Sequence, residues 1–162
     1  MTTVFDSPYF RDQFCTPAMR AVFSDTARMG AWLEVEVALA RAQAGLGFIP
    51  VEAAGEIARM AQVDALDLAA MKAGYDVSGV AIIPLVKHLG ALCSDETRRW
   101  VHWGATTQDI LDTGFTLQIR DALALIEGDL DSVIRALAAL AARHRDTVMA
   151  GRSFQQQAVP IT

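Results

Sequence analysis

A cluster of hydroxyl, amide and carboxyl side chains lies at residues 104–109, where the chain reads Gly-Ala-Thr-Thr-Gln-Asp. Thr106 and Asp109 have the spacing of a capping box, which predicts that a helix begins here. The first turn of a helix presents unpaired N–H groups and the positive end of the helix dipole, and both attract carboxylates or phosphates. The segment therefore predicts either an anion site or a simple cap. Spacing alone favours the cap, because the pattern is common.

A histidine, His102, lies four residues before this cap and is flanked by Trp100 and Trp103. An imidazole there could bind an anion or transfer a proton. The alternative is a packed histidine with one satisfied nitrogen. His88 and His144 have no ligand-type partner three or four residues away on their predicted helices, so both are interpreted as structural or solvated.

The sequence has no spacing typical of a metal or nucleotide site, since H-x-x-x-H, H-E-x-x-H, C-x-x-C and G-x-G-x-x-G are absent. Metal binding therefore has no support in the sequence. Cys15 and Cys93 form no disulfide framework, and the N-terminus has no charged and apolar leader. These features predict a cytoplasmic protein.

Composition excludes several classes of partner. Fourteen Lys and Arg against nineteen Asp and Glu give a net charge of -5, which disfavours nucleic acid and anionic membranes. The longest apolar run, 136–142, has seven residues, whereas a membrane-spanning helix needs about 20. Apolar residues make up 52% of the chain and charged residues 20%, so part of the apolar surface is expected to meet other chains.

Helices must position these residues, because apolar spacing is helical throughout and no strand pattern competes. Ser24 or Asp25 is expected to cap the first main helix. The predicted helices are 25–44, 50–62, a short one from 64 or 67 to 72, 84–93, and 106–145. The segments 74–79, 94–99 and 151–162 are expected to be a break, a charged turn and a polar loop, and 1–23 an extended lead-in with a short helix at most.

The last predicted helix has about 40 residues and a length of about 60 Å. One small domain cannot cover so long an apolar stripe, so it needs long partner helices in a bundle. The fold class is therefore predicted to be all-α. We expect an N-terminal helical domain over 1–104, and the start of a central helical-bundle domain, incomplete here, over 105–162.

Three segments in this order resemble the fumarase/aspartase superfamily, which includes the adenylosuccinate and argininosuccinate lyases. Residues 102–114 resemble its H-x-G-x-T-S-x-D-x-x-D-T segment, with Thr107 in the usual serine position. Residues 151–160 resemble its G-R-T-H-x-Q-x-A-x-P segment, and 17–25 with 46–50 resemble its N-terminal domain. The resemblance spans nearly the whole chain.

Within the superfamily, the segments 83–87, 104–109 and 117–123 are most similar to the branch of bacterial 3-carboxy-cis,cis-muconate cycloisomerases. Phe154 stands where adenylosuccinate lyases and fumarases have a catalytic histidine. A phenyl ring cannot donate a proton, so chemistry that depends on that histidine is not available. Val80 departs from the branch, which tends to have a polar residue at this position.

The resemblance implies a homotetramer whose long helices form a central bundle and whose active sites combine three subunits. It implies no cofactor and a small tricarboxylate substrate, lactonised in protocatechuate (β-ketoadipate) catabolism. His102 would be catalytic, and the substrate-binding residues would be Thr106, Thr107, Gln108, Gln156, Arg20, Arg152 and Ser153. For Arg20 and Arg152 the alternative is an intramolecular salt bridge.

The superfamily's glycine- and serine-rich catalytic loop and its C-terminal domain have no counterpart here. The chain is therefore expected to be the N-terminal part of a longer enzyme, inactive by itself. Two other functions stay open. One is a carbon–nitrogen lyase of the adenylosuccinate or argininosuccinate type, and the other is a non-catalytic helical assembly module that uses the apolar stripe.

Overall fold

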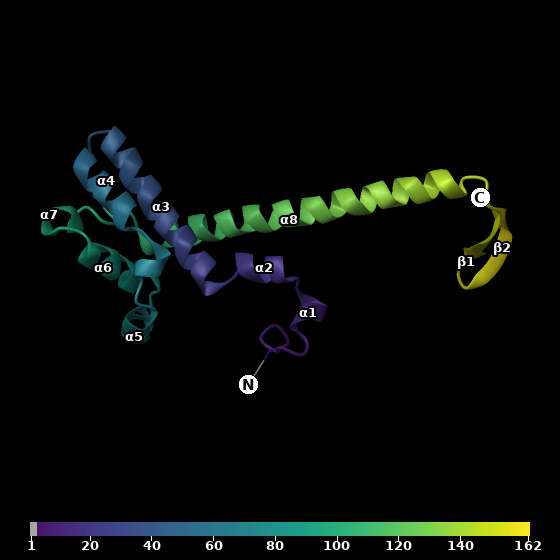
Figure 1. Cartoon of the computed structure of the whole chain (residues 1–162), viewed down its shortest axis with the longest axis horizontal. Coiled ribbons are helices and arrows are strands. Elements are labelled where there is room, and N and C mark those ends of the chain that lie inside the picture. Colours follow the sequence, from purple (N-terminus) through teal and green to yellow (C-terminus); the bar gives the residue numbers. More distant parts are fainter. Residues whose placement is uncertain (1–2) are drawn as a thin grey trace. The chain divides into compact units, whose positions relative to one another are not determined.

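The computed structural model describes residues 3–162, and helices dominate them (Figure 1). The all-α class is confirmed, with one two-stranded sheet among the described residues. No helix in this part of the chain is both long and apolar enough to cross a membrane. The elements in chain order are α1 (Arg11–Phe14), α2 (Pro17–Val22), α3 (Asp25–Gly45), α4 (Val51–Met60), the 3-10 turn η1 (Val63–Ala65), α5 (Leu68–Ser78), α6 (Ile82–Leu92), α7 (Asp95–Arg98), α8 (Thr107–His144), β1 (Met149–Ser153) and β2 (Gln156–Ile161).

The chain divides into two compact units, the first ending at Ala122 and the second covering Leu123–Thr162. The predicted domain boundary at residue 104 stays a prediction. In the first unit α3 packs on α4 and α5 on α6 (Figure 1). Apolar side chains from these helices and from the start of α8 form its core. Its fully buried apolar members are Leu33, Ile57, Ile82, Leu85, Leu89 and Ile110.

Side-chain caps explain several helix boundaries. Ser24 caps α3 as predicted, because its hydroxyl accepts a hydrogen bond from the Ala27 N–H at 3.1 Å. The predicted break at 74–79 is wrong, since α5 continues to Ser78 and ends at Gly79, whose φ is +67°. Gly74 lies inside α5, and a Cβ atom at this position would lie 2.9 Å from the Pro84 side chain of α6. It is a close-packing residue rather than a helix breaker.

The predicted charged turn at 94–99 instead contains the short helix α7. Ser94 caps it by accepting a hydrogen bond from the Thr97 N–H. The Glu56 carboxylate of α4 accepts hydrogen bonds from the N–H and hydroxyl of Ser94 and from the hydroxyl of Thr97. These bonds lower the pKa of Glu56, the Thr97 bond most strongly. A single carboxylate thus joins α4 to α7.

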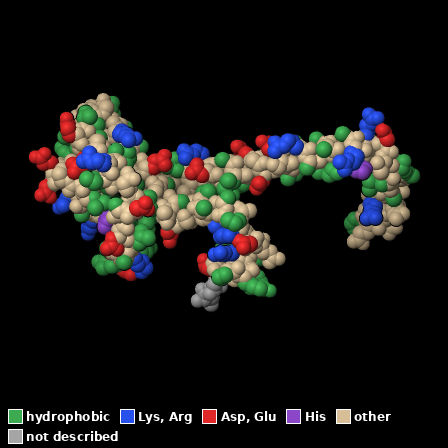
Figure 2. Space-filling model, viewed as in Figure 1, with side chains coloured by type: hydrophobic (Ala, Val, Ile, Leu, Met, Phe, Trp, Pro, Cys, Tyr) green, Lys and Arg blue, Asp and Glu red, His purple; other side chains and the backbone are tan. Residues whose placement is uncertain are grey.

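Helix α8 confirms the long helix predicted from residue 106. Its 38 residues span about 57 Å. Buried residues recur every fourth position in its first part and then stop: Ile110, Gly114, Gln118 and Ala122. Beyond them most apolar side chains are exposed, although Leu125 is half-buried, and hydrophobic side chains recur along this part of the helix in Figure 2. We call the following set the apolar stripe of α8: Leu123, Ile126, Leu130, Val133, Ile134, Leu137 and Leu140.

Gly114 is where α8 packs against Trp32 of α3. A Cβ atom at this position would lie 2.6 Å from Cδ1 of the buried Trp32 ring. We expect Gly114→Ala to lower the free energy of unfolding by about 1–3 kcal/mol through overpacking, measured by urea denaturation. The control is Gly128→Ala in the same helix, where a Cβ atom meets nothing within 4 Å. That change should raise stability by up to about 1 kcal/mol, and equal effects of the two would contradict the packing argument.

The C-terminal residues were predicted to be a polar loop and instead form a hairpin. Strands β1 and β2 pair antiparallel, with Met149 opposite Ile161 and Ser153 opposite Gln156. The sequence did not indicate these strands, because it is rich in amides and does not alternate between buried apolar and exposed polar residues. Every residue of β2 is exposed.

Candidate functional site

Two predicted site residues and a lysine line a hollow of about 200 Å³ between α6 and the start of α8. His102 and Thr107 line it from one side and Lys87 from α6. The rest of its lining is apolar: Ile82, Ile83 and Val86. Residues of α6, of the loop before α8 and of the first turn of α8 therefore surround one small space, and the surface they present to it is apolar.

The loop before α8 holds His102 in an unusual backbone conformation. Its φ is +60°, in the left-handed region that non-glycine residues seldom adopt. Trp100 and Trp103 lie on either side in sequence, and their rings make an edge contact with centroids 5.0 Å apart. The loop is fixed further by Gln43 of α3, whose amide donates a 2.6 Å hydrogen bond to the Trp103 carbonyl.

The imidazole of His102 is paired with a buried carboxylate that the sequence analysis missed. Nδ1 of His102 lies 2.6 Å from Oε1 of Glu36, whose side chain is 1% exposed. Burial raises the pKa of the Glu36 carboxyl, and the charge and hydrogen bonds of His102 oppose that rise. A sequence signal existed, because Glu36 interrupts the buried face of α3 that Trp32, Leu33 and Ala40 define.

The cap predicted at the start of α8 is present. The Thr106 N–H donates a 3.0 Å hydrogen bond to the Asp109 carboxylate, one half of a capping box. Thr106 and Gln108 are exposed, and the Gln108 amide donates to Asp112 one turn later at 2.7 Å. Of this group Thr107 is the residue that lines the hollow. Their binding roles stay predictions.

Arg20 makes local contacts. One guanidinium nitrogen lies 2.6 Å from the Asp12 carboxylate, and another donates to the Cys15 carbonyl. These are the intramolecular contacts considered as the alternative for Arg20. A role in substrate binding stays a prediction.

Arg152, Ser153 and Gln156 belong to the second unit, where they lie in the hairpin. All three are exposed. The turn between the strands consists of Phe154 and Gln155, with φ of +44° and +65°. Two successive positive φ values match a type I′ hairpin turn, which favours Asn and Gly. Phe154 stands at its tip, 99% exposed.

The strained turn gives a testable prediction. The double variant Phe154→Asn with Gln155→Gly should stabilise the hairpin by about 1–2 kcal/mol, because a left-handed conformation costs about that much per ordinary residue. Cross-strand nuclear Overhauser contacts between Met149 and Ile161 measure the hairpin population. Gln157→Gly, within β2, should weaken the same contacts. A double variant with fewer contacts than the parent chain would refute the assignment of strain to this turn.

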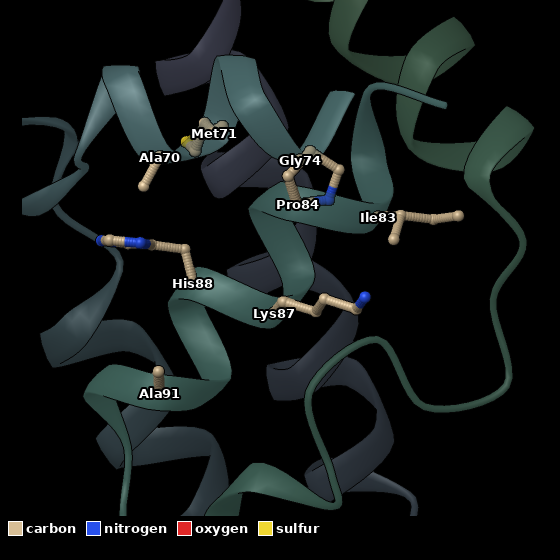
Figure 3. Close-up of a pocket in the computed structure, with 8 residues that line it drawn as sticks. All are labelled: Ala70, Met71, Gly74, Ile83, Pro84, Lys87, His88 and Ala91. Carbon is tan, nitrogen blue, oxygen red and sulfur yellow. The ribbon is translucent and has the colours of Figure 1, made fainter. Parts of the chain in front are cut away.

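A second hollow, of about 250 Å³, lies between α5 and α6 (Figure 3). His88 and Lys87 extend from α6 in opposite directions there. His88 has a structural role as predicted, since Nε2 lies 3.1 Å from the Ala65 carbonyl and 3.3 Å from the Asp67 N–H. The remaining lining is apolar apart from Lys87.

Comparison with known proteins gives consistent matches. A family model described as lyase matches residues 11–162. Trans-aconitate decarboxylase 1 of Mycosarcoma maydis is 46% identical over 151 residues, covering 93% of this chain and 31% of that protein. The 3-carboxy-cis,cis-muconate cycloisomerase of Pseudomonas putida is 43% identical over 156 residues, covering 94% and 37%.

A solved structure agrees. The 3-carboxy-cis,cis-muconate lactonizing enzyme from Pseudomonas putida superposes with a TM-score of 0.85 at 43% identity, covering 91% of this chain and 34% of that one. The chain thus spans about a third of the length of the relatives it matches.

Proposed function

The chain belongs to the lyase family of the fumarase/aspartase superfamily, and on this premise we propose that it is part of a 3-carboxy-cis,cis-muconate cycloisomerase. In the proposed reaction a carboxylate oxygen of the substrate bonds to a carbon of a double bond. The π pair of that bond takes up a proton at the neighbouring carbon, and a lactone results. Such a reaction serves protocatechuate catabolism.

The single observation that carries the proposal is the grouping of Lys87, His102 and Thr107 around one hollow at the start of α8. A tricarboxylate needs several donors and positive charges. The walls of the hollow itself are apolar, so the partial charge of the helix N-terminus and the full charge of Lys87 would act from beside it. His102 is the proposed catalytic residue, because Nδ1 faces Glu36 while Nε2 has no hydrogen-bond partner in the described part of the chain.

The exposed hairpin contains the other predicted substrate-binding residues. We assign carboxylate binding to Arg152, Ser153 and Gln156, in an active site completed by other subunits. Phe154 favours this reaction over carbon–nitrogen bond cleavage that relies on a histidine at that position, since phenylalanine has no proton to give.

Assembly into a homotetramer belongs to the same proposal. The apolar stripe of α8 leaves side chains such as Ile134 and Leu137 about 60% exposed. A single helix cannot bury such a stripe on itself, and burial against equivalent helices would stabilise it.

The test uses the protein as its gene encodes it. Purified protein should deplete the absorbance of 3-carboxy-cis,cis-muconate, with trans-aconitate and adenylosuccinate assayed in parallel. Turnover of adenylosuccinate alone would replace the proposal with a carbon–nitrogen lyase. Turnover of trans-aconitate alone would keep a tricarboxylate substrate but reject the lactonisation.

The assembly-module alternative has its own test. Gln108→Ala should lower kcat/KM by about 10- to 100-fold, the value of one hydrogen bond to a charged group. The control is Thr116→Ala. Among the described residues the Thr116 hydroxyl bonds only the Asp112 carbonyl, one helical turn earlier. Unchanged turnover in Gln108→Ala would mean that this segment only caps α8.

A further inference from the structure

Glu36 is a buried carboxylate whose surroundings call for an explanation. It lies on the core face of α3, among Trp32, Leu33 and Ala40. A buried carboxylate costs free energy unless it is paired and hydrogen-bonded. In the described part of the chain its hydrogen-bond partner is Nδ1 of His102, 66 residues away in sequence. An apolar residue would fill this place on α3 without that cost, so Glu36 has a role outside packing.

We propose that Glu36 is a positioning residue that fixes which nitrogen of His102 carries the proton. An ionised carboxylate can only accept a hydrogen bond, so Nδ1 must be its N–H donor. Neutral His102 then has an unprotonated Nε2, which can accept a proton and can donate one to a substrate only from the imidazolium form. The hydrogen bond at one ring nitrogen thereby sets the chemistry of the other.

The backbone supports this role. His102 has a φ of +60°, a conformation that persists only where its surroundings hold it. The 2.6 Å contact to Glu36 ties the ring to α3, while Gln43 of the same helix ties down the neighbouring Trp103 carbonyl. Two contacts from one rigid helix therefore orient the loop and its imidazole. The consequence for turnover rests on the proposed function, whereas the proton position does not.

The experiment measures the proton position directly in the 162-residue chain. Histidine labelled with ¹⁵N gives long-range ring correlations that distinguish the Nδ1–H from the Nε2–H tautomer, and His102→Gln identifies the signal. We expect the Nδ1–H tautomer for His102. Glu36→Gln should yield a mixture, because its amide can either donate or accept. Glu34→Gln, an exposed carboxylate on the same helix, is the matched control and should change nothing.

The wild-type spectrum alone can overturn the proposal, even if Glu36→Gln fails to fold. An Nε2–H tautomer in the wild-type chain would mean that Glu36 is protonated and donates. An unchanged tautomer in folded Glu36→Gln would also refute it. In the gene-encoded protein, Glu36→Gln should lower kcat/KM by at least about tenfold. A shifted tautomer with unchanged kcat/KM would refute the positioning role, whereas a protein inactive on every substrate refutes only the proposed function.

Discussion

Turnover of the gene-encoded protein falls by about 10²- to 10⁴-fold when His102 is replaced by alanine, the loss expected when a positioned proton-transfer group is removed. The imidazole lines the hollow at the start of α8, and Glu36 holds its Nδ1 at 2.6 Å. The measurement is kcat with 3-carboxy-cis,cis-muconate, accompanied by a circular dichroism spectrum that checks helix content.

The control for this prediction is His144→Ala. His144 is exposed at the end of α8, and its Nδ1 lies 3.2 Å from the Thr147 hydroxyl. The His144→Ala variant should therefore have the kcat of the parent protein. If His102→Ala kept more than about a tenth of the parent rate, His102 would have no part in proton transfer.

The second large effect is on stability. Leu85→Ala should lower the free energy of unfolding of the chain by about 2–5 kcal/mol, because Leu85 on α6 is 0% exposed and its removal leaves a cavity. Urea denaturation followed by helical circular dichroism measures the change, with an unchanged m-value expected.

The same substitution at an exposed position provides the comparison. Leu46, after the end of α3, is 70% exposed, so Leu46→Ala should change stability by no more than about 0.5 kcal/mol. Similar losses for the two leucines would show that the core does not lie where α6 places it.

Local signals predicted the large elements well. Ser24 and the apolar spacing after it located α3, and a proline-free run with helical spacing located α8. The errors arose where tertiary contacts decide. Gly74 was interpreted as a helix breaker, but it is small because Pro84 packs against it. The hairpin was not predicted, because Phe and Gln seldom adopt the positive φ that Phe154 and Gln155 have in its turn.

The candidate site was predictable only in part. His102 and Thr107 stand in a motif that sequence reasoning can identify, and the structure brings both to one hollow. Glu36 and Lys87 were not predicted as site residues. Each lies near the site only because helices distant in sequence pack together. A rule that treats a charged residue on an otherwise apolar helix face as a candidate would have found Glu36.

The paired tryptophans that flank His102 in sequence are an intrinsic optical probe of its loop. Trp103 is 48% exposed and its ring makes an edge contact with Trp100, so its emission depends on the conformation of the loop that carries His102. Trp32, buried against Gly114, reports on the packing of α3 with α8 in the same spectrum. Replacing Trp32 by phenylalanine would leave a signal from the loop alone, and ligand titrations could then be followed without any label.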